Sequence, residues 1–360
     1  MTSTERVLAA LDYQRPDRIP LFETYWDEFI ANWRRGKQPG PDADIYAHYG
    51  VDIAICVPDE TPWPSRAAVL EQTSTHTMER DGWGATHRTV PGGFFFEEAG
   101  VAMPEKVDPD KLEFEPPRLD ARYDAFIKSV ADARATGRCP FAKTGGPYLR
   151  ATNLRGVEQW LMDIAEDPGY ASALASRITD HMIAIGVEAI RRAGLQGTGI
   201  WIYDDIASNL GPMMSPQTYE RIFLPLMTRM VAAYRAAGAR RVIMHSDGNI
   251  LPLLNLLVAA GIDAINPVEP KAGMDIVALR ERYAGRLAFV GGLDNAFVLP
   301  SGDRARIREH VLGRVAAAQE GGIVLGSHSV GPDITVSDYD YAVSLIRSGA
   351  AGASEARRSR

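Results

Sequence analysis

The chain has 360 residues, of which 46% are hydrophobic and 24% are charged, a composition typical of a globular protein with a large core. Its formal net charge of −7 gives no basic face of the kind that binds nucleic acid. Only two cysteines occur, Cys56 and Cys139, so a disulfide framework and a cysteine-based zinc module are both excluded.

The N-terminal residues contain a charge pair, Glu5 and Arg6, and no apolar signal segment. No apolar run along the chain is long enough to cross a bilayer. We therefore expect a cytoplasmic protein that does not enter a membrane.

Eight short apolar or β-branched runs recur along the chain, and helical patterns separate most of them. The runs are Ile19–Glu23, Asp52–Val57, Phe141–Gly145, Thr198–Tyr203, Arg241–His245, Ala264–Val268, Leu287–Gly291 and Ile323–Ser327. Such runs are typical of parallel strands buried on both faces. They predict an α/β protein whose residues 1–349 form one (β/α)8 TIM barrel. The segment 350–360 is small, polar and basic, and we expect a flexible tail there.

The segment 58–117 does not follow this repeat. It contains Trp63, Trp83, a β-prone stretch at 86–90 and the run Phe94-Phe95-Phe96, with many glycines and prolines. We interpret it as an insertion after the second strand that includes a small hairpin. Insertions of this kind often lie over the catalytic face of a barrel. A structural flap that only seals the barrel is equally compatible with the sequence.

The helices of the second half have recognisable ends. Ser215 and Pro216 are typical of a helix start and Gly238 of its end, with a kink expected at Pro225. Further helices are predicted from about 249 to 260 and from about 303 to 320, each followed by glycine. Their apolar faces predict packing against the barrel.

Polar residues follow the ends of these otherwise apolar strands, where barrel enzymes carry their reactive groups. They are Glu23, Asp59 with Glu60, Tyr148, Asp204 with Asp205, His245 with Asp247, Glu269, Asp294 and His328. Each one also has a structural explanation: Asp247 or Asp294 could cap a helix or turn, and either histidine could be a core residue bonded to backbone. Their clustering favours an active site, with His245 as its central residue.

Several motifs, in this order along nearly the whole chain, resemble the uroporphyrinogen decarboxylase superfamily. They are Arg15-Pro-Asp-Arg-Ile-Pro20, Tyr203-Asp-Asp205 followed by Ser215-Pro216, Arg241-Val-Ile-Met-His245-Ser-Asp-Gly-Asn249, Asp263-Ala-Ile-Asn266-Pro, Gly291-Gly-Leu-Asp294 and Gly326-Ser-His328-Ser-Val-Gly-Pro-Asp333. The resemblance implies a (β/α)8 barrel, usually a homodimer, with a deep cleft at the strand ends. This superfamily includes porphyrinogen decarboxylases and methyltransferases that work with corrinoid proteins.

The segment after the first strand departs from the decarboxylases. Those enzymes carry arginines there to hold the carboxylates of the porphyrinogen, whereas this chain has an acidic and aromatic segment containing Glu23 and Trp26. A polycarboxylate is therefore a poor substrate, and we expect Glu23 and Trp26 to contact a smaller one. His328 matches a histidine that the decarboxylases keep, but Asp59 is no secure counterpart of their catalytic aspartate.

The superfamily's methyltransferases hold zinc through a His-x-Cys motif and a later cysteine. At the corresponding positions this chain has His245, Asp247 and His328. Two histidines and a carboxylate are metal ligands that leave open positions, suitable for zinc or for a harder ion such as iron or manganese. We therefore expect a divalent metal, with zinc as the first choice, and Glu23 as a possible further ligand.

Two functions follow from this resemblance. The first is a methyltransferase that demethylates a methoxylated or methylated small molecule, with a corrinoid protein as the methyl acceptor. In it Asp204 or Asp205 transfers a proton, Tyr148 and His328 assist, and Tyr203 and Asp294 contact the substrate. The second is a cofactor-free decarboxylase of a small acid, in which His328 and Asp205 form the acid–base pair. A non-enzymatic binding protein is disfavoured by the number of polar residues at the strand ends.

Overall fold

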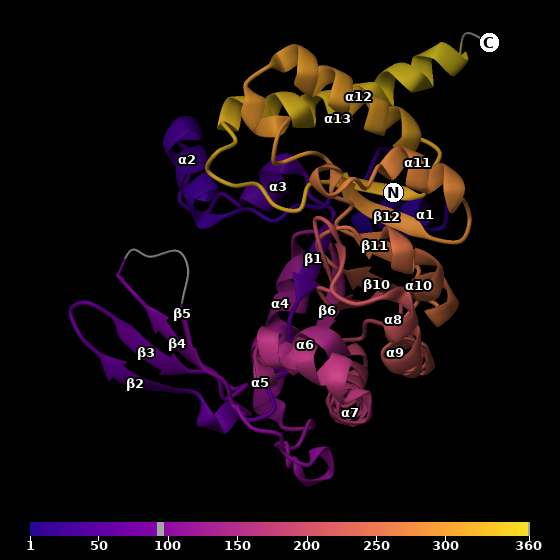
Figure 1. Ribbon diagram of the computed structural model, residues 1–360. Helices are drawn as coiled ribbons and strands as arrows, with labels where there is room; N and C mark the ends of the chain where they lie inside the picture. Colours follow the sequence, from indigo (N-terminus) through magenta and orange to yellow (C-terminus); the bar gives the residue numbers. More distant parts are fainter. Residues whose placement is uncertain (92–96, 359–360) are drawn as a thin grey trace.

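The computed structural model describes residues 1–91 and 97–358. Within these residues, the main sheet is curled and has seven parallel strands in the order β1-β6-β7-β10-β11-β12-β13 (Figure 1). Their bounds are β1 (Ile53–Cys56), β6 (Cys139–Gly145), β7 (Gly199–Tyr203), β10 (Arg241–His245), β11 (Ala264–Asn266), β12 (Ala288–Gly292) and β13 (Ile323–Gly326). Each of these strands falls on a run predicted from the sequence. The architecture is an α/β fold compatible with a TIM barrel.

The first predicted run, at residues 19–23, does not form a regular strand. It makes isolated parallel bridges instead, from Leu21 to Leu325 and, just beyond the run, from Tyr25 to Val330. The Phe22 N–H donates to the Leu325 carbonyl at 2.9 Å, and on the other side the Asp52 N–H donates to the Leu21 carbonyl at 2.7 Å. This segment therefore lies between β13 and the start of β1. Its ladder is short because Pro20 has no N–H to donate.

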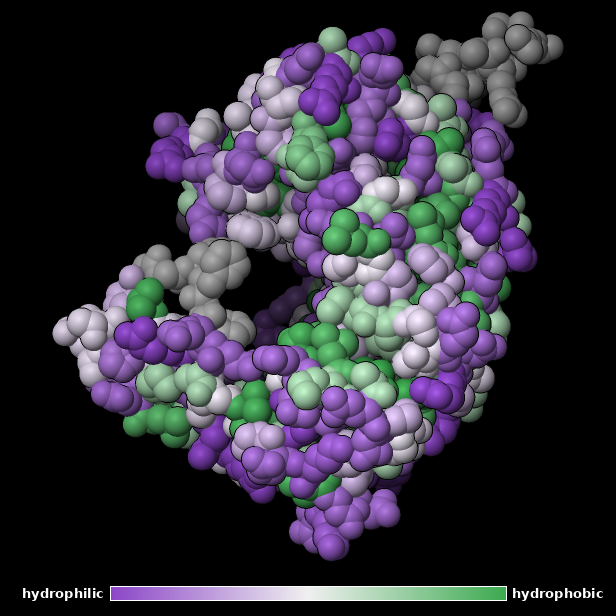
Figure 2. All heavy atoms as spheres, viewed as in Figure 1, coloured by the Kyte–Doolittle hydropathy of each residue, from purple (hydrophilic) through white to green (hydrophobic). Residues whose placement is uncertain are grey.

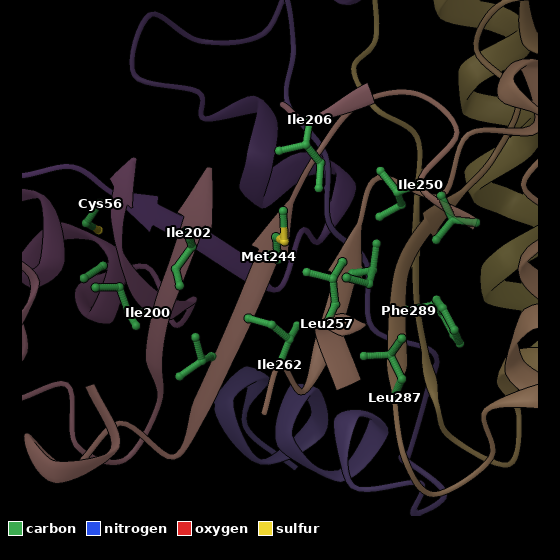
Figure 3. Packing of buried hydrophobic residues seen from close by; sticks show 14 of the residues in the cluster. Cys56, Ile200, Ile202, Ile206, Met244, Ile250, Leu257, Ile262, Leu287 and Phe289 are labelled. Atoms are coloured by element: carbon green, nitrogen blue, oxygen red, sulfur yellow. The ribbon is translucent and has the colours of Figure 1, made fainter. Parts of the chain in front are cut away.

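The two faces of the main sheet bury different sets of residues. One face carries the inner cluster, which includes Phe22, Ile53, Phe141, Trp201, Ile243 and Val324 and is also contacted by helix α1 (Ser3–Leu11). The other face carries Ile200, Ile202, Met244 and Phe289, which pack beneath the helices (Figure 3). This alternation follows from the two-residue period of a strand.

Helices surround the sheet and pack either against its strands or against one another. They include α4 (Asp124–Ala135), α5 (Pro147–Arg155), α6 (Val157–Glu166), α7 (Pro168–Arg192), α8 (Pro216–Ile222), α9 (Leu224–Ala236), α10 (Leu254–Ala260), α11 (Ile276–Arg282), α12 (Arg304–Ala318) and α13 (Val336–Arg358). None of the helices in the described residues is long and apolar enough to cross a membrane. Helix α13 continues to Arg358, through most of the segment that we expected to be a tail.

The predicted helix ends can be compared with the structure directly. Ser215 caps α8 by accepting from the Thr218 N–H, and Asp303 caps α12. The helix interruption expected at Pro225 lies two residues earlier: α8 ends at Ile222, and α9 begins at Leu224 with Pro225 in its first turn, where its missing N–H is harmless. Helix α10 ends at Gly261, which has a left-handed φ of 90°.

The segment between β1 and β6 forms a second sheet. Its antiparallel strands are β2 (Ala68–Gln72), β3 (Thr77–Arg80), β4 (Thr86–Thr89) and β5 (Glu97–Gly100), so it is larger than the single hairpin that we predicted. The run Phe94-Phe95-Phe96 lies outside the described residues. This sheet stands apart from the main sheet, and a hollow separates it from the region of α2 (Asp27–Lys37) and α3 (Ile45–Tyr49) (Figures 1 and 2).

Candidate active site at the strand ends

Four polar or aromatic side chains continue the inner cluster toward the carboxyl ends of the strands. Lys143, Tyr203, His245 and Asn266 each come two residues after an inner-cluster residue of the same strand, namely Phe141, Trp201, Ile243 and Ala264. Because strand side chains alternate, all four point to the inner face of the sheet. They form the floor of the candidate site.

His245, Asp247 and His328 come together at this end of the sheet. Asp247 Oδ1 lies 3.4 Å from His245 Nε2 and 3.5 Å from His328 Nε2. Their ligand atoms all lie within 4.8 Å of one another. His245 ends β10, Asp247 follows it by two residues, and His328 follows β13. The sequence motif therefore predicted a group that the fold assembles from two separate strands.

Asn266 and Tyr203 fix the orientation of His245. Asn266 Nδ2 donates to the Val290 carbonyl at 3.2 Å, so its Oδ1, 2.7 Å from His245 Nδ1, accepts the imidazole proton. His245 Nε2 then presents its lone pair to Asp247. The Tyr203 ring stacks on the imidazole with centroids 4.1 Å apart. Burial lowers the pKa of His245, which favours the neutral, ligand-competent form.

Asp247 does not cap a helix, which was its alternative explanation. Leu251 N–H, at the start of the next helical turn, donates to Asn249 Oδ1 instead. Asp247 Oδ1 is inaccessible to solvent and accepts no hydrogen bond from the described residues. Burial raises the pKa of Asp247. A buried carboxylate oxygen between two imidazole nitrogens thus lacks the partner that such groups normally have.

His328 is more exposed than His245 and faces a second carboxylate. Its Nδ1 lies 3.8 Å from Glu269 Oε1, which also lies 3.0 Å from Lys271 Nζ. The other oxygen of Glu269 accepts from the Gly248 N–H at 2.9 Å. Glu269, a strand-end residue in the sequence, therefore supports the loop between Asp247 and the helix that follows.

Glu23 does not join the histidine–carboxylate group, and its prediction as a metal ligand is wrong. It is 1% exposed, and its two oxygens accept from the Ser327 N–H at 2.9 Å and the Ser327 hydroxyl at 2.7 Å. Its neighbour Phe22 belongs to the inner cluster, so Glu23 points to the opposite face. Burial raises its pKa to about 8.

Asp204 and Asp205 follow the same strand but have different environments. Asp204 is fully buried at the start of α5, where its Oδ1 accepts from the Leu149 N–H at 2.7 Å, and burial raises its pKa to about 7. Asp205 is partly exposed, accepts from the Asp247 N–H at 3.1 Å and lies 3.8 Å from His245 Nε2. Only Asp205 faces the candidate site.

Tyr148, Asp294 and Trp26 have structural contacts. Tyr148 is 2% exposed and packs edge-on against Phe223 in the outer core, which is a core role and not the predicted catalytic one. Asp294 Oδ1 accepts from two backbone N–H groups of its own turn, which is the turn-capping role that the sequence also allowed. Trp26 is 36% exposed, and its indole N–H donates to the Ser329 hydroxyl at 3.1 Å, one residue beyond His328.

Sequence reasoning missed two residues of the floor, Lys143 and Asn266. Each lies in an apolar strand two residues after an inward-facing residue of the inner cluster, and that spacing was visible in the sequence. Of the other strand-end acids, Glu60 is tied to Arg150 and accepts from the Gly145 N–H at 2.6 Å. Asp59 accepts from the Thr61 N–H and hydroxyl.

The chain is similar to known proteins in family and in fold. The family described as "Uroporphyrinogen decarboxylase (URO-D)" matches residues 96–348. A methyltransferase from Methanosarcina mazei has the same fold, with a TM-score of 0.67, 17% identity and coverage of 97% of this chain and 98% of that one.

A putative vitamin-B12 independent methionine synthase from Listeria monocytogenes is 12% identical over 92% of this chain and 94% of its own, with a TM-score of 0.40. No curated protein matches the chain. Because the URO-D match spans well over half of the sequence, and because the strand-end motifs fall within it, the protein belongs to the uroporphyrinogen decarboxylase family.

Proposed function

We propose that the protein is a methyltransferase that removes a methyl group from a methoxylated or methylated small molecule. The observation that carries this proposal is the group of His245, Asp247 and His328, in which the buried Asp247 Oδ1 has no hydrogen-bond partner among the described residues. Such a group suits a divalent metal, and zinc is our first choice.

The spacing of the three residues fits a metal ion. Ligands bound about 2.1 Å from a tetrahedral ion lie roughly 3.4 Å from one another. Asp247 Oδ1 lies at this spacing from both imidazole nitrogens, at 3.4 and 3.5 Å. The Asn266 contact leaves His245 Nε2 unprotonated, as a ligand must be. A bound ion would act as a Lewis acid that polarises the atom carrying the methyl group or its acceptor.

The residues around this group would provide proton transfer, positioning of His245 and contact with the substrate. Asp205 lies beside His245 and is partly exposed, so we propose it for proton transfer to the demethylated product. Tyr203 holds the His245 ring in place by stacking. Trp26, bonded to Ser329 next to His328, would contact the substrate. A corrinoid protein is the proposed methyl acceptor, and a homodimer is the proposed assembly.

The architecture supports this assignment. We propose that the segment 19–25 completes an eight-stranded barrel, because it is bonded to Leu325 on one side and to Asp52 on the other. The insertion leaves the carboxyl end of β1, the same end of the sheet at which His245 lies. We therefore propose that the β2–β5 sheet covers the catalytic face of a single-domain barrel.

A cofactor-free decarboxylase remains the second candidate. Its support is that His328 Nε2 and Asp247 Oδ1, 3.5 Å apart, could exchange a proton without any metal, with Asp205 next to them. In that case the three residues would serve as an acid–base set and would hold no ion.

Elemental analysis of the purified protein, followed by a transfer assay, separates these functions. We expect one divalent ion per chain, and methyl transfer from methoxylated probes to free cob(I)alamin that stops on chelation and returns with zinc. His245→Ala should lose both the metal and the activity. His48→Ala, at an exposed position on α3, is the matched control and should keep both.

A different set of results would favour the decarboxylase. A protein that binds no zinc when zinc is supplied, and that releases carbon dioxide from small acids after chelation, would make the decarboxylase the correct assignment. His328→Ala and Asp205→Asn should then abolish carbon dioxide release.

A further inference from the structure

Lys143 lies on the floor of the candidate site but outside the histidine–carboxylate group. Its Nζ is 4.2 Å from the centre of the Tyr203 ring, and His245 stacks on the same ring at 4.1 Å. Two groups this close to one ring centre cannot share a face, so Lys143 and His245 flank Tyr203. The strand order β6-β7-β10 requires the same arrangement. The ammonium and the imidazole are therefore roughly 8 Å apart.

The other lysines in the described part of the chain all pair with a carboxylate. The pairs are Lys37 with Asp340, Lys106 with Asp167, Lys111 with Asp108, Lys128 with Asp132 and Lys271 with Glu269. Among the same residues, no carboxylate oxygen lies within 4.0 Å of Lys143 Nζ. Lys143 is thus the exception, although it lies on the floor of the candidate site, 4.2 Å from the centre of the Tyr203 ring.

The acids around Lys143 are already engaged. Glu60 is paired with Arg150 and accepts from the Gly145 N–H. Asp205 accepts from the Asp247 N–H at 3.1 Å. Burial is the main cause that lowers the pKa of Lys143. An ammonium group that is partly removed from water and has no carboxylate in contact is unfavourable, and an anion that contacts it would relieve this.

We propose that Lys143 binds a carboxylate group of the substrate, which makes the substrate a small carboxylic acid. One unpaired ammonium matches one carboxylate, whereas a polycarboxylate would need several cations. The separation across Tyr203 suits an acid of about one ring, whose far end reaches His245, Asp247 and His328. The chemical group that reacts at this far end rests on the proposed function, whereas the carboxylate site at Lys143 does not depend on it.

Lysine labelling read by mass spectrometry tests this site without knowledge of the reaction. The protein is treated with acetic anhydride in the presence of acetate, benzoate or 4-methoxybenzoate, each compared with its neutral amide. A bound carboxylate raises the pKa of the amine and so slows labelling about tenfold. We expect this protection at Lys143 with at least one acid, no protection with the amides, and no change at Lys128.

Two results overturn the proposal: labelling of Lys143 that no acid slows relative to its amide, or a Lys143 that the reagent cannot reach. His245→Ala should keep the protection, because the carboxylate site does not need the metal group. Lys143→Gln should keep the wild-type metal content but lose calorimetric binding of the protective acid, and Lys128→Gln should keep both. If an acid protects Lys143 from labelling but the protein binds no metal, only the proposed function is rejected. If the protein binds metal but no acid protects Lys143, only this inference is rejected.

Discussion

Asn266 Oδ1 lies 2.7 Å from His245 Nδ1, and this contact decides which imidazole nitrogen faces Asp247. The Asn266 amide is itself held by the Val290 carbonyl on the neighbouring strand β12. Three adjacent strands, β10, β11 and β12, therefore set the tautomer and the ring position of one histidine. This makes Asn266 a positioning residue that does not need to touch the substrate.

Replacing Asn266 should weaken zinc binding without removing a ligand. We expect Asn266→Ala to lower zinc affinity about 10- to 100-fold, because His245 loses the acceptor for its Nδ1 proton. Competition with a chromophoric chelator measures this change. Asn266→Asp, which can still accept that proton, should retain most of the affinity, and Asn32→Ala on α2 should retain all of it. Equal affinity in Asn266→Ala and the wild type would reject the positioning role.

Zinc should stabilise the folded protein. A ligand present at 100 times its dissociation constant adds about 2.7 kcal/mol to the free energy of unfolding. Thermal denaturation should therefore show a higher Tm with zinc, and a chelator should reverse the rise. Asp247→Ala removes the carboxylate that lies between the two histidines, so its Tm should not respond to zinc. The same zinc response in Asp247→Ala and the wild type would show that the ion binds elsewhere.

Gly326 should be essential for the contact between β13 and the first predicted strand. A Cβ at this position would overlap the Phe22 carbonyl oxygen, which is backbone and cannot move aside alone. We expect Gly326→Ala to lower the free energy of unfolding by about 1–3 kcal/mol in urea denaturation. Gly313→Ala on α12 is the control, because nothing lies within 4 Å of its Cβ and the helix should gain about 0.5–1 kcal/mol.

Glu23 should make stability fall as the pH rises. Its pKa is raised to about 8 in the folded protein by burial, whereas in the unfolded chain it ionises near 4.5. Between these values the folded state holds a proton that the unfolded state has lost, so the free energy of unfolding decreases as the pH increases through this window. Glu23→Gln can still bond to both groups of Ser327 and should remove this contribution.

Urea denaturation at pH 5 and pH 8 measures the Glu23 effect. The loss of stability between the two pH values should be smaller in Glu23→Gln than in the wild type. Glu220→Gln, at an exposed position on α8, should behave as the wild type. An unchanged pH dependence in Glu23→Gln would mean that Glu23 is ionised in the folded state.

The sequence by itself determined the strands of the main sheet and several helix ends. Buried parallel strands need short apolar runs, and caps such as Ser215 and Asp303 satisfy N–H groups of their own helix, so both signals are local. The spacing of His245 and Asp247 was local as well. His328 was expected at the same end of the sheet because it follows the last predicted strand, and its Nε2 lies 3.5 Å from Asp247 Oδ1.

Only the tertiary structure decided which strand-end residues face the site. Asp204 and Asp205 are adjacent in sequence, yet Asp204 meets the first turn of α5 while Asp205 meets the Asp247 N–H. Glu23 turned away because the strand alternation placed Phe22 inward, and Ser327 then enclosed its carboxylate. The partner of a side chain at a strand end belongs to a different strand or helix, and the register that brings the two together is set by packing across the whole sheet.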